Sequence, residues 1–233
     1  MVDSQPQPGD IPSDSTVPKA VVARLSLYLR ELQRLEAAGQ QTISSAQLGT
    51  LLGFSDAQVR KDLGFFGQFG YPGVGYRCDE LIRAMRDILG TNHVWPVVMV
   101  GVGNLGQALL GYRGFARQNF RIVSAFDCDP AKVGGTINGI PVRHVDELAD
   151  VVRREQIRLG LVVVPAERAQ EVADRLVAAG VEGIVNFAPV TLSLPPQVQL
   201  VSVDLAIELE QLSFAVTSKL HAALGQSGGQ PGG

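Results

Sequence analysis

The chain has little of several features that would narrow its function quickly. Its two cysteines, Cys78 and Cys128, lie far apart and lack the paired spacing of a metal site. Its longest apolar run, around residues 95–102, is too short to span a bilayer. A basic segment followed by an apolar one, as in a secretory signal, is also missing from the N-terminus. We therefore expect a cytoplasmic protein with reduced thiols, no membrane segment and no metal.

Catalytic side chains are equally scarce. The three histidines, His93, His144 and His221, have no evident partner in the sequence. Cys128 adjoins Asp127, but a redox role for this thiol has little support. A dehydrogenase usually needs an acid or base beside the nicotinamide. The sequence therefore predicts no catalytic residue and favours a binding protein over an enzyme.

Net positive charge is missing as well, since the 233 residues carry a formal charge of −3. The charge is unevenly distributed, because residues 17–90 hold nine Lys or Arg against seven Asp or Glu. Residues 1–16 and 225–233 are rich in Pro, Ser, Gln or Gly and are predicted to be disordered tails. Residues 17–90 are therefore the segment whose charge is compatible with a basic surface.

Residues 17–90 are predicted to form a winged helix-turn-helix domain. A first helix follows Pro18, and S-x-x-Q sequences at 44–47 and 55–58 look like capping boxes that open two short helices. Two short helices joined by a tight glycine-containing turn make a helix-turn-helix. The glycine-rich segment 67–76 then fits a hairpin wing.

The second short helix is the predicted recognition helix. Its apolar positions Val59, Leu63 and Phe66 face the core, which leaves Arg60 and Lys61 on the opposite face. An Arg-Lys pair alone is more often a solvated helix face, so the surrounding motif carries the prediction. The residues expected to contact phosphates or base edges are Ser44, Ser45, Ser55, Gln58, Arg60, Lys61 and Gly73.

From Trp95 onward, apolar strands alternate with amphipathic helices. This alternation predicts a parallel sheet covered by helices, and therefore an α/β domain of the Rossmann kind over residues 91–203. Strands are expected at 95–101, 121–127, 140–143, 159–164, 183–187 and 198–203, with helices at 104–117, 146–156 and 167–179.

The first strand of this domain runs into the sequence Gly101-x-Gly103-x-x-Gly106. Such a turn lets a pyrophosphate approach the backbone at a helix N-terminus. Asp127 ends the next strand, where a carboxylate can accept hydrogen bonds from both ribose hydroxyls and would repel a 2′-phosphate. The motif therefore favours NAD(H) over NADP(H), although glycines that serve packing alone are the plainer reading of such a match.

A long helix is expected at residues 204–224, before the predicted tail. Its apolar residues exceed what the edge of one small domain can cover. We therefore expect a partner subunit to cover them, and the apolar positions are Leu205, Ile207, Leu209, Leu212, Phe214, Val216 and Leu220.

Several of these segments, in this order, resemble the Rex family of NADH-sensing redox repressors. The resemblance covers roughly residues 17–224 and rests on Arg24–Arg30, Gln58–Leu63, Gly73–Tyr76, the glycine turn, Asn186–Pro189 and Val203–Asp204. It implies a homodimer with a swapped C-terminal helix, which binds operator DNA when NADH is scarce and releases it when NADH rises. NADH and NAD⁺ would compete for one site as ligands that are not turned over.

The resemblance also implies roles for individual residues. Arg30 would pair with Asp204 in the DNA-competent form, and Tyr112 would take over that aspartate when NADH is bound. Each residue also has a plainer interpretation: Arg30 as a solvated charge on the first helix, Asp204 as a helix N-cap and Tyr112 as a packed ring. The expected nucleotide site comprises Gly101, Val102, Gly103, Asn104, Leu105, Gly106, Asp127, Val164, Pro165, Asn186 and Phe187.

Three other functions remain open from the sequence. The first is an NAD-dependent oxidoreductase with an accessory DNA-binding domain, and the second is a coenzyme A-binding module on the same sheet. The third is a constitutive DNA-binding protein whose sheet domain only dimerises. Turnover of NADH, tight coenzyme A binding and NADH-independent operator binding would identify them in turn.

Overall fold

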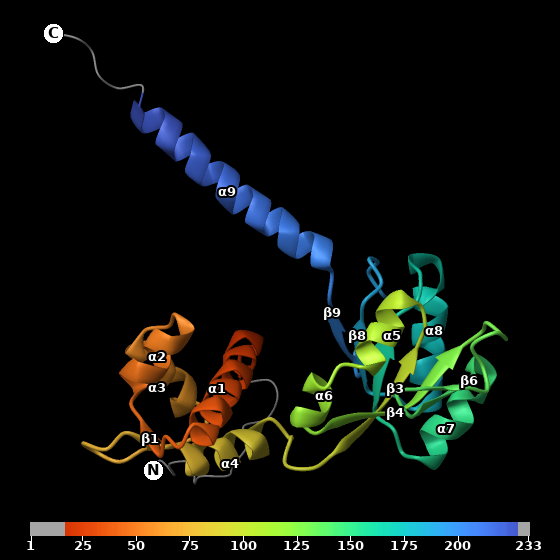
Figure 1. The fold of residues 1–233 in the computed structure, drawn as a ribbon, viewed down its shortest axis with the longest axis horizontal. Helices are drawn as coiled ribbons and strands as arrows, with labels where there is room; N and C mark the ends of the chain where they lie inside the picture. The colour runs from red at the N-terminus through yellow and green to blue at the C-terminus, as the bar shows by residue number, and fades with distance from the viewer. Residues whose placement is uncertain (1–16, 228–233) are drawn as a thin grey trace. The chain divides into compact units, whose positions relative to one another are not determined.

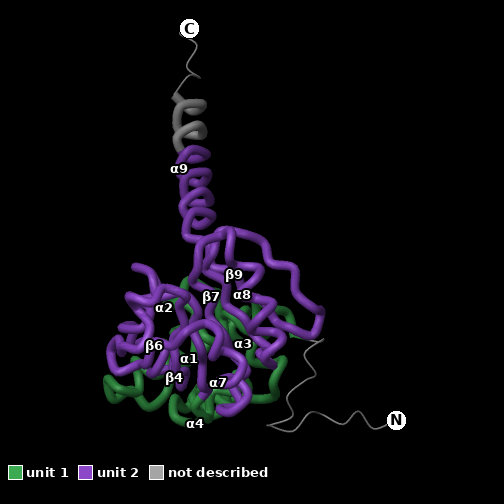
Figure 2. Tube along the Cα trace, turned by 90° about the vertical axis from the view of Figure 1, so that its right-hand side faces the viewer, with its two compact units in different colours: residues 1–94 green, residues 95–233 purple. Residues whose placement is uncertain are grey.

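The computed structural model describes residues 17–227 and divides the chain into two compact units, residues 1–94 and 95–233 (Figure 2). The boundary falls a few residues after the predicted one, because Trp95 opens the first strand of the second unit. The predicted tail at 1–16 and residues 228–233 lie outside the described residues. Residues 225–227 were expected to be tail as well, but they form the last turn of a helix.

The first unit packs its helices in pairs, α1 against α4 and α2 against α3, around one apolar core (Figure 1). The core is centred on α1, where Leu25, Tyr28 and Leu32 are fully buried. Its elements are α1 (Lys19–Ala37), β1 (Thr42–Ile43), α2 (Ser45–Leu52), α3 (Asp56–Gly64), β2 (Tyr76–Arg77) and α4 (Cys78–Ile88).

Local hydrogen bonds explain where the two short helices begin. Ser44 caps α2 with a complete capping box, because its hydroxyl accepts from the Gln47 N–H and the Gln47 side chain accepts from the Ser44 N–H. Gly53 ends α2 in the left-handed conformation, at φ 75°. The capping box predicted for α3 is only half right. Ser55 accepts from the Gln58 N–H, but the Gln58 side chain turns inward to Asp62.

The wing forms a narrow hairpin between residues 71 and 75. The Tyr71 N–H donates to the Gly75 carbonyl, and the Val74 N–H donates to the Tyr71 carbonyl across a turn that carries Pro72 and Gly73. Gly73 adopts φ 76°, as the third position of such a turn requires. The returning strand β2 pairs with β1, a partner that the sequence pattern did not reveal.

The second unit is a seven-stranded sheet in the order β5-β6-β4-β3-β7-β8-β9, parallel except for β5. One face packs against α7 and α8, and the other against α5 and α6 (Figure 1). Its elements are β3 (Trp95–Val100), α5 (Asn104–Leu110), α6 (Gly114–Arg117), β4 (Phe120–Asp127), β5 (Thr136–Ile137), β6 (Ile140–His144), η1 (Val145–Glu147), α7 (Leu148–Arg154), β7 (Leu159–Val162), α8 (Ala166–Ala179), β8 (Gly183–Asn186), β9 (Gln199–Ser202) and α9 (Leu205–Ser227).

The strand order places β3 at the topological switch point, with β4 on one side and β7 on the other. In open α/β sheets, ligands bind outside the carboxyl ends of the strands at this point. The glycine turn follows β3 there, and Asp127 ends the neighbouring β4.

One predicted helix is divided in the structure, and one strand of the sheet was not predicted. The helix expected at 104–117 is two helices, because α5 ends at Leu110 and the chain turns through 111–113 before α6. Gly111 and Gly114 flank this break, and glycine is a poor helix former. The short antiparallel strand β5 was not predicted at all.

The terminal helix α9 leaves its apolar side chains exposed in the single chain. Leu205, Leu209, Leu212, Phe214 and Val216 are each more than half exposed. None of the described helices is long and apolar enough to cross a membrane. In the part of the chain that the structure describes, no three His, Cys, Asp or Glu side chains are grouped as a metal site.

Candidate functional site

Two of the three glycines in the turn after β3 are required by packing inside the unit. A Cβ on Gly101, which adopts φ 102°, would collide with the Val163 carbonyl. A Cβ on Gly106 would collide with the Gly101 carbonyl, so this glycine brings α5 close to the turn. The plainer reading of the motif therefore accounts for Gly101 and Gly106.

Packing does not account for Gly103. It is exposed, and an added Cβ would meet no atom within 4 Å. Its neighbours Asn104 and Leu105 are exposed as well. The space above Gly103 is therefore open for the close backbone approach that a pyrophosphate needs.

Asp127 lies against this turn. Its Oδ2 accepts from the Val102 N–H at 2.8 Å, and its Oδ1 accepts from the Asp129 N–H at 3.0 Å. Burial raises the pKa of Asp127, but the N–H groups of Asp129 and Val102 and the ammonium of Lys132 outweigh it, so the pKa is lowered. The side chain is an anion that fixes the turn to the end of β4 and remains 10% exposed.

Lys132 is part of this site, although the sequence pattern marked it only as a loop lysine. Its ammonium lies 3.2 Å from Asp127 Oδ2 and 3.6 Å from Asp129 Oδ2. The signal that could have found it is the spacing Asp-x-Asp-x-x-Lys from 127 to 132, which returns the lysine to both acids across one turn.

The other expected nucleotide residues follow β7 and β8. Val164 packs partly into the core, and Pro165 is exposed just before α8. Asn186 is fully buried, and its amide bonds to the backbone of Ala188 and Val190. These bonds commit the Asn186 side chain to holding its own loop, in which Phe187 is partly buried.

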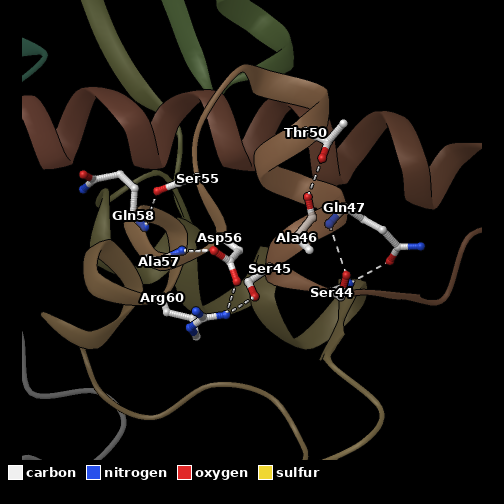
Figure 3. Close-up of polar contacts among 10 residues, drawn as sticks. All are labelled: Ser44, Ser45, Ala46, Gln47, Thr50, Ser55, Asp56, Ala57, Gln58 and Arg60. Atoms are coloured by element: carbon white, nitrogen blue, oxygen red, sulfur yellow. Dashed lines mark hydrogen bonds and ion pairs between the residues drawn. The ribbon is translucent and has the colours of Figure 1, made fainter.

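On the first unit, the expected DNA contacts gather where α3 meets the start of α2 (Figure 3). Arg60 Nη1 donates to Asp56 Oδ2 at 2.8 Å and to Ser45 Oγ at 3.1 Å. The hydrogen bond from Arg60 and the Ala57 N–H lower the pKa of Asp56. Lys61 is exposed, and within residues 17–227 its ammonium makes no ion pair. Arg60 is thus held by a carboxylate while Lys61 is free.

The remaining expected DNA contacts lie at the edges of this surface. Ser55 is exposed at the start of α3, and Ser44 and Ser45 line a groove of about 530 Å³ whose other wall is the wing, residues 69–76. Gly73 is exposed in the turn of that wing. Gln58 is directed inward, because its side chain donates to Asp62 at 2.7 Å.

Asp62 is a fully buried carboxylate that the sequence did not single out. Arg24 donates to both of its oxygens, at 2.6 and 2.8 Å, and the Tyr28 hydroxyl donates at 2.8 Å. Burial raises the pKa of Asp62, but the hydrogen bonds from Arg24, Tyr28 and Gln58 outweigh it, so the pKa is lowered. Burial and the Asp62 hydrogen bond raise the pKa of Tyr28. This cluster fixes the recognition helix to α1.

The three expected switch residues are divided between the units. Arg30 is exposed on α1, whereas Tyr112 and Asp204 belong to the second unit. Tyr112 is 56% exposed, and its ring stands edge-on to Phe115 at 5.1 Å between centroids. Asp204 Oδ1 accepts from the Ala206 N–H at the start of α9, as the capping reading predicts.

Two family models match the chain, one in each unit. Residues 16–64 match a putative DNA-binding protein N-terminus, and residues 92–190 match a CoA binding domain. A redox-sensing transcriptional repressor Rex from Desulfitobacterium hafniense is 48% identical over 87% of this chain and 97% of the relative. The chain belongs to the Rex family of redox-sensing transcriptional repressors. The Rex of Streptomyces coelicolor is 43% identical over 92% of this chain and 83% of its own length.

Solved Rex-family structures share the fold over nearly the whole chain. A structure of RSP in complex with β-NAD⁺ and operator DNA matches with a TM-score of 0.84 and 34% identity, over 92% of this chain and 99% of that chain. A structure of RSP in complex with β-NADH matches with a TM-score of 0.80 and 34% identity, over 90% and 99%. The predicted fold class, a winged helix-turn-helix followed by a Rossmann-like sheet and a terminal helix, is confirmed.

Proposed function

We propose that this chain is a transcriptional repressor that binds operator DNA through its first unit and NADH or NAD⁺ through its second. NADH binding releases the operator, so the protein responds to the NADH/NAD⁺ ratio. The observation that carries the proposal is the match, at 92% coverage, to a Rex-family protein solved with both β-NAD⁺ and operator DNA. A protein that binds chromosomal operators acts in the compartment that holds them, so we also infer a cytoplasmic location.

The glycine turn supports the nucleotide site. The open space at Gly103 fits a pyrophosphate, and Asp127 supplies anionic oxygens that accept hydrogen bonds from the ribose hydroxyls. The proposed site keeps Gly101, Val102, Asn104, Leu105 and Gly106 as the turn itself. Val164, Pro165 and Phe187 supply the neighbouring strand ends, while Asn186 acts by holding its loop.

The exposed face of α3 supports the DNA site. Lys61 is proposed to contact a phosphate and Arg60 a base edge, with Ser44, Ser45, Ser55 and Gly73 along the backbone. Gln58 contributes through Asp62, because its amide is turned inward.

The uncovered side of α9 supports a homodimer through that helix. Leu209 and Leu212 are 67% and 62% exposed, which is costly for a helix in water unless a second copy covers them.

We also propose how the two ligands are coupled: Arg30 pairs with Asp204 when DNA is bound, and Tyr112 pairs with Asp204 instead when NADH is bound. One exposed ion pair is worth too little to drive such a change alone, so subunit repacking acts with it.

Two other functions are tested by the same protein preparation. The match to a CoA binding domain favours coenzyme A as a second candidate ligand, but Asp127 suits a ribose with free hydroxyls rather than a phosphorylated one. An oxidoreductase would consume NADH in the presence of small carbonyl compounds, and we expect no such turnover.

The decisive experiment uses two variants with opposite defects. Arg60→Ala is expected to weaken operator binding in a gel shift at fixed salt while leaving NADH affinity intact. Asp127→Ala is expected to lower NADH affinity at least tenfold, as measured by fluorescence titration, while operator binding persists. If the two variants lost both activities together, or neither, the assignment of one ligand to each unit would be wrong.

A further inference from the structure

The recognition helix carries a carboxylate on the side where a DNA-binding surface needs positive charge. Asp56 lies one helical turn before Arg60, and both side chains are about half exposed, at 46% and 55%. Asp56 has both oxygens engaged, since Oδ2 accepts from Arg60 and Oδ1 accepts from the Ala57 N–H. The surface therefore loses one of the two charges that Arg60 and Lys61 would offer a phosphate.

The contacts of Arg60 show which part of its guanidinium remains available. Only Nη1 is engaged among the described residues, by Asp56 and by Ser45 from the neighbouring helix (Figure 3). The edge formed by Nε and Nη2 is left without a protein partner in that part of the chain. Two adjacent N–H donors are what an arginine uses to bind O6 and N7 of a guanine together.

We propose that Asp56 is a specificity-determining residue, which holds Arg60 by Nη1 and directs its free edge to a base while repelling phosphates. The proposal rests on the proposed DNA-binding function. Phosphate contacts supply sequence-independent affinity, and base contacts supply discrimination. A carboxylate beside Arg60 lowers the first and preserves the second.

Asp56 also has a purely structural role open to it. An acid in the first turn of a helix interacts favourably with the helix dipole, and Asp56 accepts from the Ala57 N–H, one of the N–H groups that have no partner within α3. This role predicts a change in stability when Asp56 is replaced, with no change in the preference of the protein for one DNA sequence over another.

The test measures affinity for two duplexes as a function of salt. One duplex carries the sequence that the wild-type protein enriches from a random pool, and the other is a shuffled duplex of the same length and composition. The variants are Asp56→Asn, which removes the charge but keeps an acceptor for Ala57, and Asp56→Ala, which removes both. Asp79→Asn is the matched control, because Asp79 is an exposed acid in the first turn of α4 and pairs with Arg83 at the same spacing, at 3.0 Å.

We expect Asp56→Asn to bind the shuffled duplex more tightly, with a salt dependence steeper by about 0.9 in log K per log salt, the value for one additional phosphate neutralised. The preference for the enriched duplex should fall by at least about fivefold, the lower end of what one bidentate base contact contributes. Asp56→Ala should show the same change, and Asp79→Asn should show neither.

Two results would overturn the proposal: an unchanged preference in Asp56→Asn, or an equal change in Asp79→Asn, which would make the effect one of net charge alone. A wild-type protein that enriches no sequence would instead contradict the proposed function. Thermal unfolding of each variant separates both outcomes from a folding defect, and Asp56→Asn keeps the test valid if Asp56→Ala does not fold.

Discussion

Removing the Asp62 carboxylate is expected to destabilise the first unit far more than any exposed charge does. In Asp62→Ala, the buried hydroxyl of Tyr28 loses its acceptor, and the guanidinium of Arg24, whose side chain is only 22% exposed, loses two hydrogen bonds. Breaking a buried ion pair by removing one partner costs about 3–5 kcal/mol. We take the lower end, about 3 kcal/mol, because Arg24 retains some contact with water.

Amide hydrogen exchange of α1 and α3 is the suitable assay, because the single tryptophan, Trp95, lies in the second unit and does not report on the first. If the free energy of unfolding falls by about 3 kcal/mol, amides that exchange only when the unit unfolds should exchange faster, by on the order of a hundredfold. Amides in β3 and β4 should be unaffected. Asp79→Asn serves as the control, since each of its exposed pairs, with Arg83 and with Arg77, is worth about 1 kcal/mol at most.

An exchange rate in α1 and α3 that changes no more in Asp62→Ala than in Asp79→Asn would refute the reasoning. It would mean that the cluster of Arg24, Tyr28 and Gln58 around Asp62 does not hold the recognition helix on α1.

Acidification tests the Asp62 cluster again, and substitutions at three glycines test the nucleotide turn and the Tyr112 ring. The lowered pKa of Asp62 means that its stabilisation is present above its unfolded pKa, about 4, and is lost as pH falls through the folded value. The stability gap between wild type and Asp62→Asn should therefore shrink on acidification, and chemical denaturation across that range measures it; a constant gap would contradict it. Gly103→Val should abolish NADH binding in a titration and lower the unfolding temperature less than Gly106→Val does, because only the Cβ at position 106 meets backbone; equal decreases in unfolding temperature would count against this. Gly114→Ala should displace the Tyr112 ring, which a Cβ there would strike, and so reduce NADH-driven operator release without loss of NADH affinity; normal release would remove Tyr112 from the switch.

The parts of the fold that depend on short-range chemistry could be predicted from the sequence. The capping box at Ser44 and the left-handed Gly53 place α2, and the alternation of strands and helices from Trp95 gives the parallel sheet. Gly101 and Gly106 lie where the motif requires them. The cap and the left-handed glycine of α2 are decided by residues a few positions apart, and the sheet and the glycine turn follow patterns that one sequence contains, although the Val163 carbonyl that requires Gly101 lies far along the chain.

The parts that were missed depend on distant or competing partners. The sequence does not single out Asp62, because its partners Arg24 and Tyr28 lie 38 and 34 residues earlier in the chain. The same carboxylate takes the Gln58 side chain away from the expected capping box of α3. The strand β1 has only two residues, too few for alternation to show. Lys132 gains its role only when the turn brings it back to Asp127.

We propose that NADH and operator DNA each weaken the binding of the other to this protein. The most direct measurement is the dissociation constant of NADH with and without saturating operator duplex, beside that of the operator with and without saturating NADH, all at one salt concentration. Linkage requires the two ratios to be equal, and we expect both ligands to weaken each other by the same factor. An NADH affinity that operator DNA leaves unchanged would contradict the account.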